Sequence, residues 1–247
     1  MPVPATWLPY CGAAPDPEAI LARWNWDPAL LALLLVFGAL AIRAPLSSRE
    51  RSFALASLGM AFLLFVSPFC ALTSALFAAR SAHHVILTAL LAPLVAMALG
   101  RAGAARLPGN LGFWTAASAV TLWLWHAPPL YAAALSSDAL YWLMQASLGI
   151  TALCFWISVL RSAQAPAISA LLAYMVQMGL LGALLTFSTA PYYAPHALTT
   201  AAWDLSPLED QQLAGLIMWV PGGLIYLAAA LALMRRLLTE PREPATA

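Results

Sequence analysis

The sequence contains no lysine, because all eleven of its basic residues are arginines. A retinylidene Schiff base requires a lysine amine, so covalently bound retinal is excluded even for a bundle of seven helices. Charged residues of both signs make up only 9% of the 247 residues, and the formal net charge is +1. A chain with so few charges and almost no net positive charge lacks the basic surface that binds nucleic acid, and no nucleic-acid partner is expected.

Cysteine is scarce too, with three residues at positions 11, 70 and 154. An odd number of widely separated cysteines argues against a disulfide framework. The sequence has no G-x-S-x-G, no H-E-x-x-H, no Gly-rich phosphate loop and no C-x-x-C, so no familiar nucleophile or phosphate-binding motif is present. Its N-terminus lacks a basic region and a compact apolar core, and we therefore expect no cleavable signal peptide.

Apolar residues dominate instead, at 63% of the chain. A transmembrane helix needs roughly 20 apolar residues, and backbone groups in lipid must pair within the segment. We therefore predict an all-α integral membrane protein, a seven-transmembrane-helix bundle, with an outer arm at residues 1–25, a single membrane domain at 26–238 and a cytoplasmic tail at 239–247. The predicted spans are Trp26–Ile42, Ser52–Phe77, Ala82–Gly100, Leu111–Leu135, Ala139–Leu160, Ala167–Ser188 and Glu209–Leu238.

The arginines orient these spans. If the N-terminus lies outside, only Arg23 and Arg80 fall on the outer side, and the other nine fall on the inner side. Cytoplasmic loops carry an excess of basic residues, so we expect the N-terminus outside and the C-terminus inside, in a multi-pass protein of a bacterial inner membrane. The nine inner residues are Arg43, Arg49, Arg51, Arg101, Arg106, Arg161, Arg235, Arg236 and Arg242.

All four histidines fall toward the outer side in this topology. His83 and His84 open the third span, and His196 lies in the loop before the seventh. His126 lies about fifteen residues into the fourth span, roughly 22 Å from its inner end. An ionisable residue within a membrane is a functional candidate, and Asp210 begins the seventh span at the same level. The alternatives are an interfacial role for His83, His84 and His196 and a structural hydrogen bond for His126.

The stretch "WLWHAPPLY" places two prolines directly after His126. Pro128 and Pro129 lack N–H groups, so the carbonyls of Leu124 and Trp125 lose their usual donors. The pattern predicts a helix break that opens the outer half of the bundle at His126, although ordinary kinking is the alternative. Similar breaks are expected at Pro68, Pro93 and Pro221.

Metal chemistry is compatible with these side chains. Imidazole binds zinc, copper, iron and nickel, while sulfur ligands favour Cu(I). Met218 is seven residues after Gln211 and shares its helix face, and Cys70 lies in the outer half of the second span. Most of the methionines are expected to fill the core. Cys11, on the outer arm, is either a mobile ligand or an inert thiol.

Five segments together resemble the multi-spanning CtaG family of cytochrome c oxidase assembly factors, named from caa(3)-type oxidases. They are "YCG…RWNWDP" near the N-terminus, "SPF" at Ser67–Phe69, "HHVILTALLAPL" at His83–Leu94, "WHAPPLYAAAL" at Trp125–Leu135 and "EDQQLAGLIMWVPGGLIYL" at Glu209–Leu227. The family is implicated in making the copper centres of the oxidase, so the resemblance implies copper as the metal and an oxidase subunit as the partner.

Residue by residue, the resemblance carries over to His84, His126, Asp210 and Gln211. Many members have two histidines four residues apart at the start of the third span. Here the earlier position is Arg80, and the neighbouring His83 points about 100° away from His84.

Three functions compete at this point. The first is an assembly factor, not an enzyme, that holds copper or passes it to an oxidase subunit at the outer side of the bilayer. The second is a membrane-embedded hydrolase in which zinc activates water. The third is a copper or small-solute permease with broken helices. The candidate metal ligands are His84, His126, His83 and His196, and the candidate polar residues around them are Asp210, Gln211, Arg80, Met218 and Cys70. The sequence leaves the oligomeric state open.

Overall fold

The structure, a computed structural model, describes residues 7–104 and 108–239, and every regular element in these ranges is helical. The all-α prediction is therefore confirmed. Arg106, Arg242 and the predicted tail beyond Thr239 lie outside the described residues. Three short 3₁₀ turns, η1, η3 and η4, occupy Ile20–Ala22, Ala194–His196 and Ala201–Trp203. The main elements are α1 (Pro28–Arg43), α2 (Ser48–Phe65), α3 (Pro68–Ala75), α4 (Phe77–Ile86), η2 (Leu87–Leu91), α5 (Ala92–Ala104), α6 (Leu111–Trp125), α7 (Pro128–Ala134), α8 (Asp138–Arg161), α9 (Gln164–Thr186), α10 (Pro207–Ile217), η5 (Met218–Gly222) and α11 (Gly223–Thr239).

Several of these helices are long and apolar enough to cross a membrane. In the described part of the chain there are four, and a fifth if α2 and α3, which meet at 44°, form one bent span. The helices α1 and α6 are apolar but shorter. The chain is therefore built as a membrane protein, while the count of seven spans and the orientation of the termini stay predictions. The four long helical segments are Phe77–Gly100, Asp138–Arg161, Gln164–Thr186 and Pro207–Thr239.

Proline breaks these helices where the sequence predicts. Pro68 and Pro128 each begin a new helix, α3 and α7, because proline fits the first turn, where its missing N–H has no acceptor to serve. Pro221 lies inside η5, and Pro93 is the second residue of α5, the helix that follows η2. Both η2 and η5 are π-helical turns, which commonly occur as single bulges within α-helices. The helix breaks predicted at Pro68 and Pro128 are thus confirmed, and near Pro93 and Pro221 the helix is irregular through a π-helical turn.

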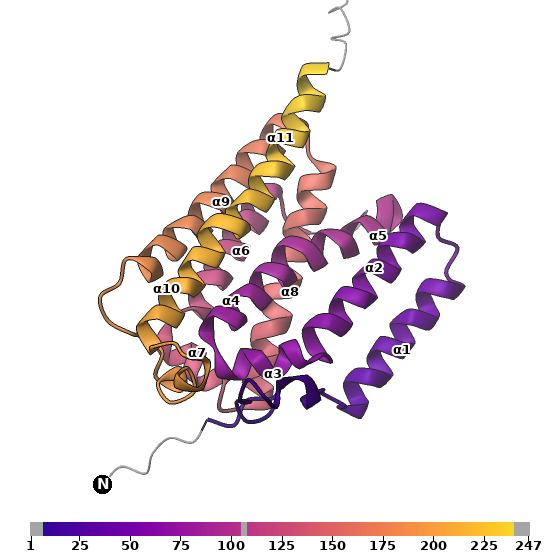
Figure 1. Ribbon diagram of the computed structural model, residues 1–247. Coiled ribbons are helices and arrows are strands. Elements are labelled where there is room, and N and C mark those ends of the chain that lie inside the picture. The colour runs from indigo at the N-terminus through magenta and orange to yellow at the C-terminus, as the bar shows by residue number, and fades with distance from the viewer. Residues whose placement is uncertain (1–6, 105–107, 240–247) are drawn as a thin grey trace, which may run out of the picture.

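One end of the bundle gathers the N-terminal arm, α3, α7, the loop 189–206 and the start of α10, and we call it the arm end (Figure 1). The described end of α11 lies at the opposite end of the bundle. The arm is tied down by a disulfide between Cys11 and Cys70. The indole N–H of Trp203 also donates to the Pro15 carbonyl at 3.2 Å. The expectation that the chain lacks a disulfide is therefore wrong.

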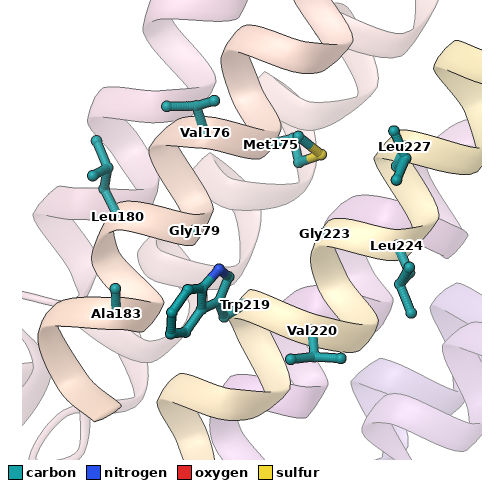
Figure 2. A pocket seen from close by; sticks show the side chains of 10 residues that line it. All are labelled: Met175, Val176, Gly179, Leu180, Ala183, Trp219, Val220, Gly223, Leu224 and Leu227. Carbon is teal, nitrogen blue, oxygen red and sulfur yellow. The ribbon is translucent and has the colours of Figure 1, made fainter. Parts of the chain in front are cut away.

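The bundle has an apolar surface, and a set of polar and charged side chains is buried among the apolar residues of its core. Large leucine, valine and phenylalanine side chains are exposed on most helices, whereas arginine, histidine and aspartate side chains are buried between them. Two apolar hollows open on the surface. One, of about 510 Å³, lies between α1, α2 and α5. The other, of about 430 Å³, lies between α9 and α11, where the Trp219 ring faces Gly179 (Figure 2). No histidine lines either hollow.

Candidate functional site

His84 and His126 face each other in the interior of the bundle. Their ring centroids are 5.5 Å apart, and their ring planes meet at 80°. Both side chains are buried, with 1% and 3% of their surface exposed. Neither ring nitrogen of His84 has a hydrogen-bond partner among the described residues, and neither does Nε2 of His126. The predicted approach of these two rings is confirmed.

The proline break positions His126. Helix α6 ends at Trp125, His126 caps it, and α7 begins at Pro128. Nδ1 of His126 lies 2.7 Å from the carbonyl oxygen of Leu122. A carbonyl only accepts, so Nδ1 carries the proton in this pair and Nε2 of the neutral ring keeps its lone pair. The His126 carbonyl, freed by the break, accepts a hydrogen bond from the Tyr193 hydroxyl at 2.8 Å.

His83 points to the other side of α4. Its Nε2 lies 3.2 Å from the Leu64 carbonyl, and its ring packs edge-on against Phe65, with centroids 5.1 Å apart. The centroids of His83 and His84 are 6.0 Å apart. His83 therefore borders the His84–His126 pair and is anchored to α2. We refer to His83, His84 and His126 as the histidine cluster.

His196 does not join the histidine cluster. Its Nδ1 lies 3.2 Å from the Ala75 carbonyl, so that nitrogen donates, and its Nε2 accepts the hydroxyl of Tyr131 at 2.6 Å. Burial lowers the pKa of His196 to about 4, the charge of Arg80 acts in the same direction, and the Ala75 bond opposes both. Both nitrogens thus join the loop 189–206 to α3 and α7.

Asp210 and Gln211 bond to backbone groups rather than to imidazoles. The two carboxylate oxygens of Asp210 accept the N–H groups of Phe77 and Ala78, at 2.7 and 3.0 Å. Gln211 accepts the N–H of Tyr192 and donates to the Ala190 carbonyl. Asp210 closes the N-terminus of α4, and Gln211 holds the loop 189–206. The expectation that one of them orients a histidine ring is wrong for the bonds they make here.

Arg80 lies inside α4 and is completely buried. The sequence places it in an outer loop because the third span is predicted to begin at Ala82, whereas α4 begins at Phe77. Its guanidinium lies over the Tyr141 ring, 5.2 Å from the centroid. Arg80 therefore contributes no surface charge to the topology, and it borders the histidine cluster from within the same helix.

The two sulfur candidates lie apart from the cluster. Met218 is buried in η5 as part of the hydrophobic core. The sulfur of Cys70 is in the disulfide with Cys11, so it has no thiolate to offer a metal in this structure. Cys154, in α8, has a free thiol.

Sequence reasoning missed the tyrosines around the site. Tyr131 and Tyr193 bond to His196 and His126, and the Tyr141 hydroxyl lies 3.7 Å from Cys11 Sγ. Tyrosine is common at membrane interfaces, so composition alone does not mark these three. Their position beside histidine in "WLWHAPPLY" and "PYYAPH" is the local signal for the first two.

The geometry limits what the cluster can bind. Within the described residues, no group of three or more His, Cys, Asp and Glu side chains is placed to hold a metal ion. Two imidazole nitrogens that share an ion lie about 2.0 Å from it, and each ring centroid lies roughly 1.2 Å behind its nitrogen, so centroids up to about 6.4 Å apart are compatible. The 5.5 Å between His84 and His126 falls in that range. Two imidazoles alone are too few ligands for a closed, four-coordinate structural site.

The family described as "Cytochrome c oxidase caa3 assembly factor (Caa3_CtaG)" matches residues 31–240, most of the chain. The match contains every candidate metal ligand and surrounding polar residue, and the segment "YCG…RWNWDP" lies before it. No curated protein and no solved structure matches the chain.

Proposed function

This chain belongs to the cytochrome c oxidase caa3 assembly factor family, and we propose that it holds copper at His84 and His126 and passes it to an oxidase subunit. In this proposal copper is cargo, and the protein is not an enzyme. The observation that carries it is the pair of facing, buried rings with ring nitrogens that no described residue uses.

The chemistry of the pair suits a soft cargo. Neutral imidazole is a ligand for copper, and the bond from His126 Nδ1 to the Leu122 carbonyl fixes that ring and leaves Nε2 toward the site. With two protein ligands, the remaining positions on the ion stay available to the receiving subunit. Transfer is complete when ligands of the receiving subunit have bound the open positions and replaced both imidazoles in turn.

We place the site toward the outer side of a bacterial inner membrane, in a seven-span chain with an outer N-terminus. Two features support this. The arm end carries the disulfide, and disulfides persist in oxidising compartments such as the periplasm. The inner side, in the same orientation, receives nine of the arginines.

The test is His126→Gln, with two quantities measured in the same cells: abundance of the protein in the membrane and copper content of the oxidase. Glutamine can still donate to the Leu122 carbonyl, so we expect normal abundance. An amide is a poor Cu(I) ligand, so oxidase copper should fall, and excess copper should partly restore it.

Ser118→Ala, in the same helix, is the matched control, since it should change neither quantity. Normal oxidase copper in the His126 variant contradicts the proposal, and zinc rather than copper in the purified protein supports the hydrolase alternative.

A further inference from the structure

Arg80 carries a positive charge that no described residue neutralises. Its side chain is 0% exposed, and Nε, Nη1 and Nη2 all lack a hydrogen-bond partner in the described part of the chain. An isolated buried charge is strongly unfavourable, and buried charges are normally paired. Its guanidinium lies over the face of the Tyr141 ring, and a cation–π contact offsets only part of the desolvation penalty.

The buried carboxylate of Asp210 is not available to neutralise Arg80. Asp210 is fully buried, and both of its oxygens accept backbone N–H groups at the start of α4. The hydroxyls of Tyr131 and Tyr141 lie near enough to Arg80 to act as hydrogen-bonding and electrostatic neighbours of the guanidinium, but they are neutral. The Tyr131 hydroxyl also donates to His196. Neither group can supply the missing negative charge.

A second unpartnered group lies on the same side of α8. Gln145 is four residues after Tyr141, so the two share a helix face, and Arg80 lies over the Tyr141 ring. Gln145 is 3% exposed, and neither its amide nitrogen nor its amide oxygen has a partner among the described residues. The Arg80 guanidinium and the Gln145 amide group thus both lie beside Tyr141, and the amide N–H₂ is a second donor in a buried region whose neighbouring oxygens are uncharged.

We propose that Arg80 and Gln145 form a binding site for a small monovalent anion, of the size of formate or chloride. One negative charge balances the one guanidinium charge, and complete burial restricts the size. The guanidinium fork offers several parallel N–H donors to an anion.

The anion site also bears on copper, and this part rests on the proposed function. Arg80 and His84 are four residues apart on one face of α4, so the guanidinium repels a cation held by His84. A bound anion offsets that repulsion. Copper and the anion should therefore each raise the affinity for the other by the same factor.

The first experiment needs no copper. The full-length protein, purified in detergent, is unfolded by heat in sodium formate, sodium chloride or sodium gluconate at constant ionic strength, gluconate being too large for the site. In formate and in chloride the unfolding midpoint should rise by about 3–6 °C for each tenfold increase above the dissociation constant, and in gluconate it should stay constant. Arg80→Gln should lose the dependence, and Arg23→Gln should keep it, since Arg23 bonds to the Ala13 carbonyl on the arm. Equal midpoints of the wild type in the three salts overturn the proposal, as does an unchanged anion dependence in Arg80→Gln.

The second experiment measures Cu(I) affinity by competition with a chelator, in formate and in gluconate. Formate should raise the affinity of the wild type about fivefold or more and leave that of Arg80→Gln unchanged. Copper binding without any anion dependence in either experiment overturns this inference and leaves the proposed function intact. Anion-dependent stability without copper binding overturns the proposed function and supports the anion site.

Discussion

The carboxylate of Asp210 accepts a 2.7 Å hydrogen bond from the backbone N–H of Phe77, 133 positions earlier in the chain. Together with the bond from Ala78, it satisfies two of the free N–H groups at the N-terminus of α4. A negative charge at that end is also favoured by the helix dipole. The helix that carries His84 is thus held in place by a side chain on α10.

Replacing Asp210 with alanine should therefore destabilise the fold. Two buried N–H groups lose a charged acceptor, and we expect a loss of about 2–4 kcal/mol. Asp210→Asn keeps one acceptor oxygen and should lose less. Thermal unfolding in detergent measures both. Glu209→Gln is the control, because this exposed neighbour only caps its own helix. Similar losses for Asp210→Ala and Glu209→Gln would contradict the anchoring role.

His84 and His196 should respond in opposite ways to the same substitution. His84→Leu removes two nitrogens that have no partner, so stability should be kept or rise while Cu(I) affinity falls. His196→Leu leaves the Tyr131 hydroxyl without its acceptor and should cost about 1–3 kcal/mol with no change in Cu(I) affinity. Unfolding midpoints and chelator competition measure the two effects. A fall in Cu(I) affinity only for the His196 variant would place the ligand in the loop instead.

Acid should weaken the protein partly through His196. Its pKa is about 4 in the folded chain, below the ordinary value near 6.5, so the unfolded state binds more protons between these values. Its contribution is therefore complete above pH 6.5 and is lost as the pH falls toward 4, with a full size of about 3 kcal/mol. His196→Gln should have a shallower pH dependence of stability than the wild type. Parallel curves for the two proteins would show that His196 does not titrate in this way.

Reduction should loosen the arm end. The Cys11–Cys70 disulfide closes a long loop, with a sequence separation of 59, and removal of such a bond typically costs about 2–5 kcal/mol. Cys11→Ser and treatment with a reductant should lower the unfolding midpoint by the same amount and should not add to each other. Labelling of the denatured protein should find one free thiol before reduction and three after it. Cys154→Ser is the control and should respond to reductant as the wild type does.

The topology is tested with reporter fusions. Fusions at Ala13, at Gly103 and after Arg242 should read outside, inside and inside, because the arginines favour that orientation. An inside reading at Ala13 would mean that the first span is wrong, and it would also conflict with a disulfide-forming environment for Cys11.

The local chemistry of the chain was enough to predict its helices and their breaks. Apolar runs and the missing N–H of proline act within a few residues, so the interruption before Pro128 and a helix irregularity at Pro221 could be predicted, although the π-helical form of the latter could not. The approach of His84 to His126 could be predicted because both fall at one depth in neighbouring spans.

What could not be predicted depends on contacts between distant segments. Helix α4 begins at Phe77 rather than at Ala82, because Asp210 reaches it from α10. That earlier start draws Arg80 into the interior, although an arginine beside an apolar run is typical of a loop. The disulfide has the same origin, since cysteine spacing does not reveal that the arm folds back over α3.

The π-helical turn η2 also sets the direction in which the side chains before it point. A π turn holds one residue more than an α turn, so η2 rotates the part of the helix that bears His84 by about 100° relative to α5. The same turn leaves the Thr88 carbonyl free to accept the indole N–H of Trp156 at 2.9 Å. Deleting one residue there would restore an unbroken α-helix and swing the histidine away from its partner, with every side chain still present. The approach of His84 to His126 therefore depends on the number of residues in η2 as well as on which residues they are, and a one-residue deletion would test this separately from any substitution.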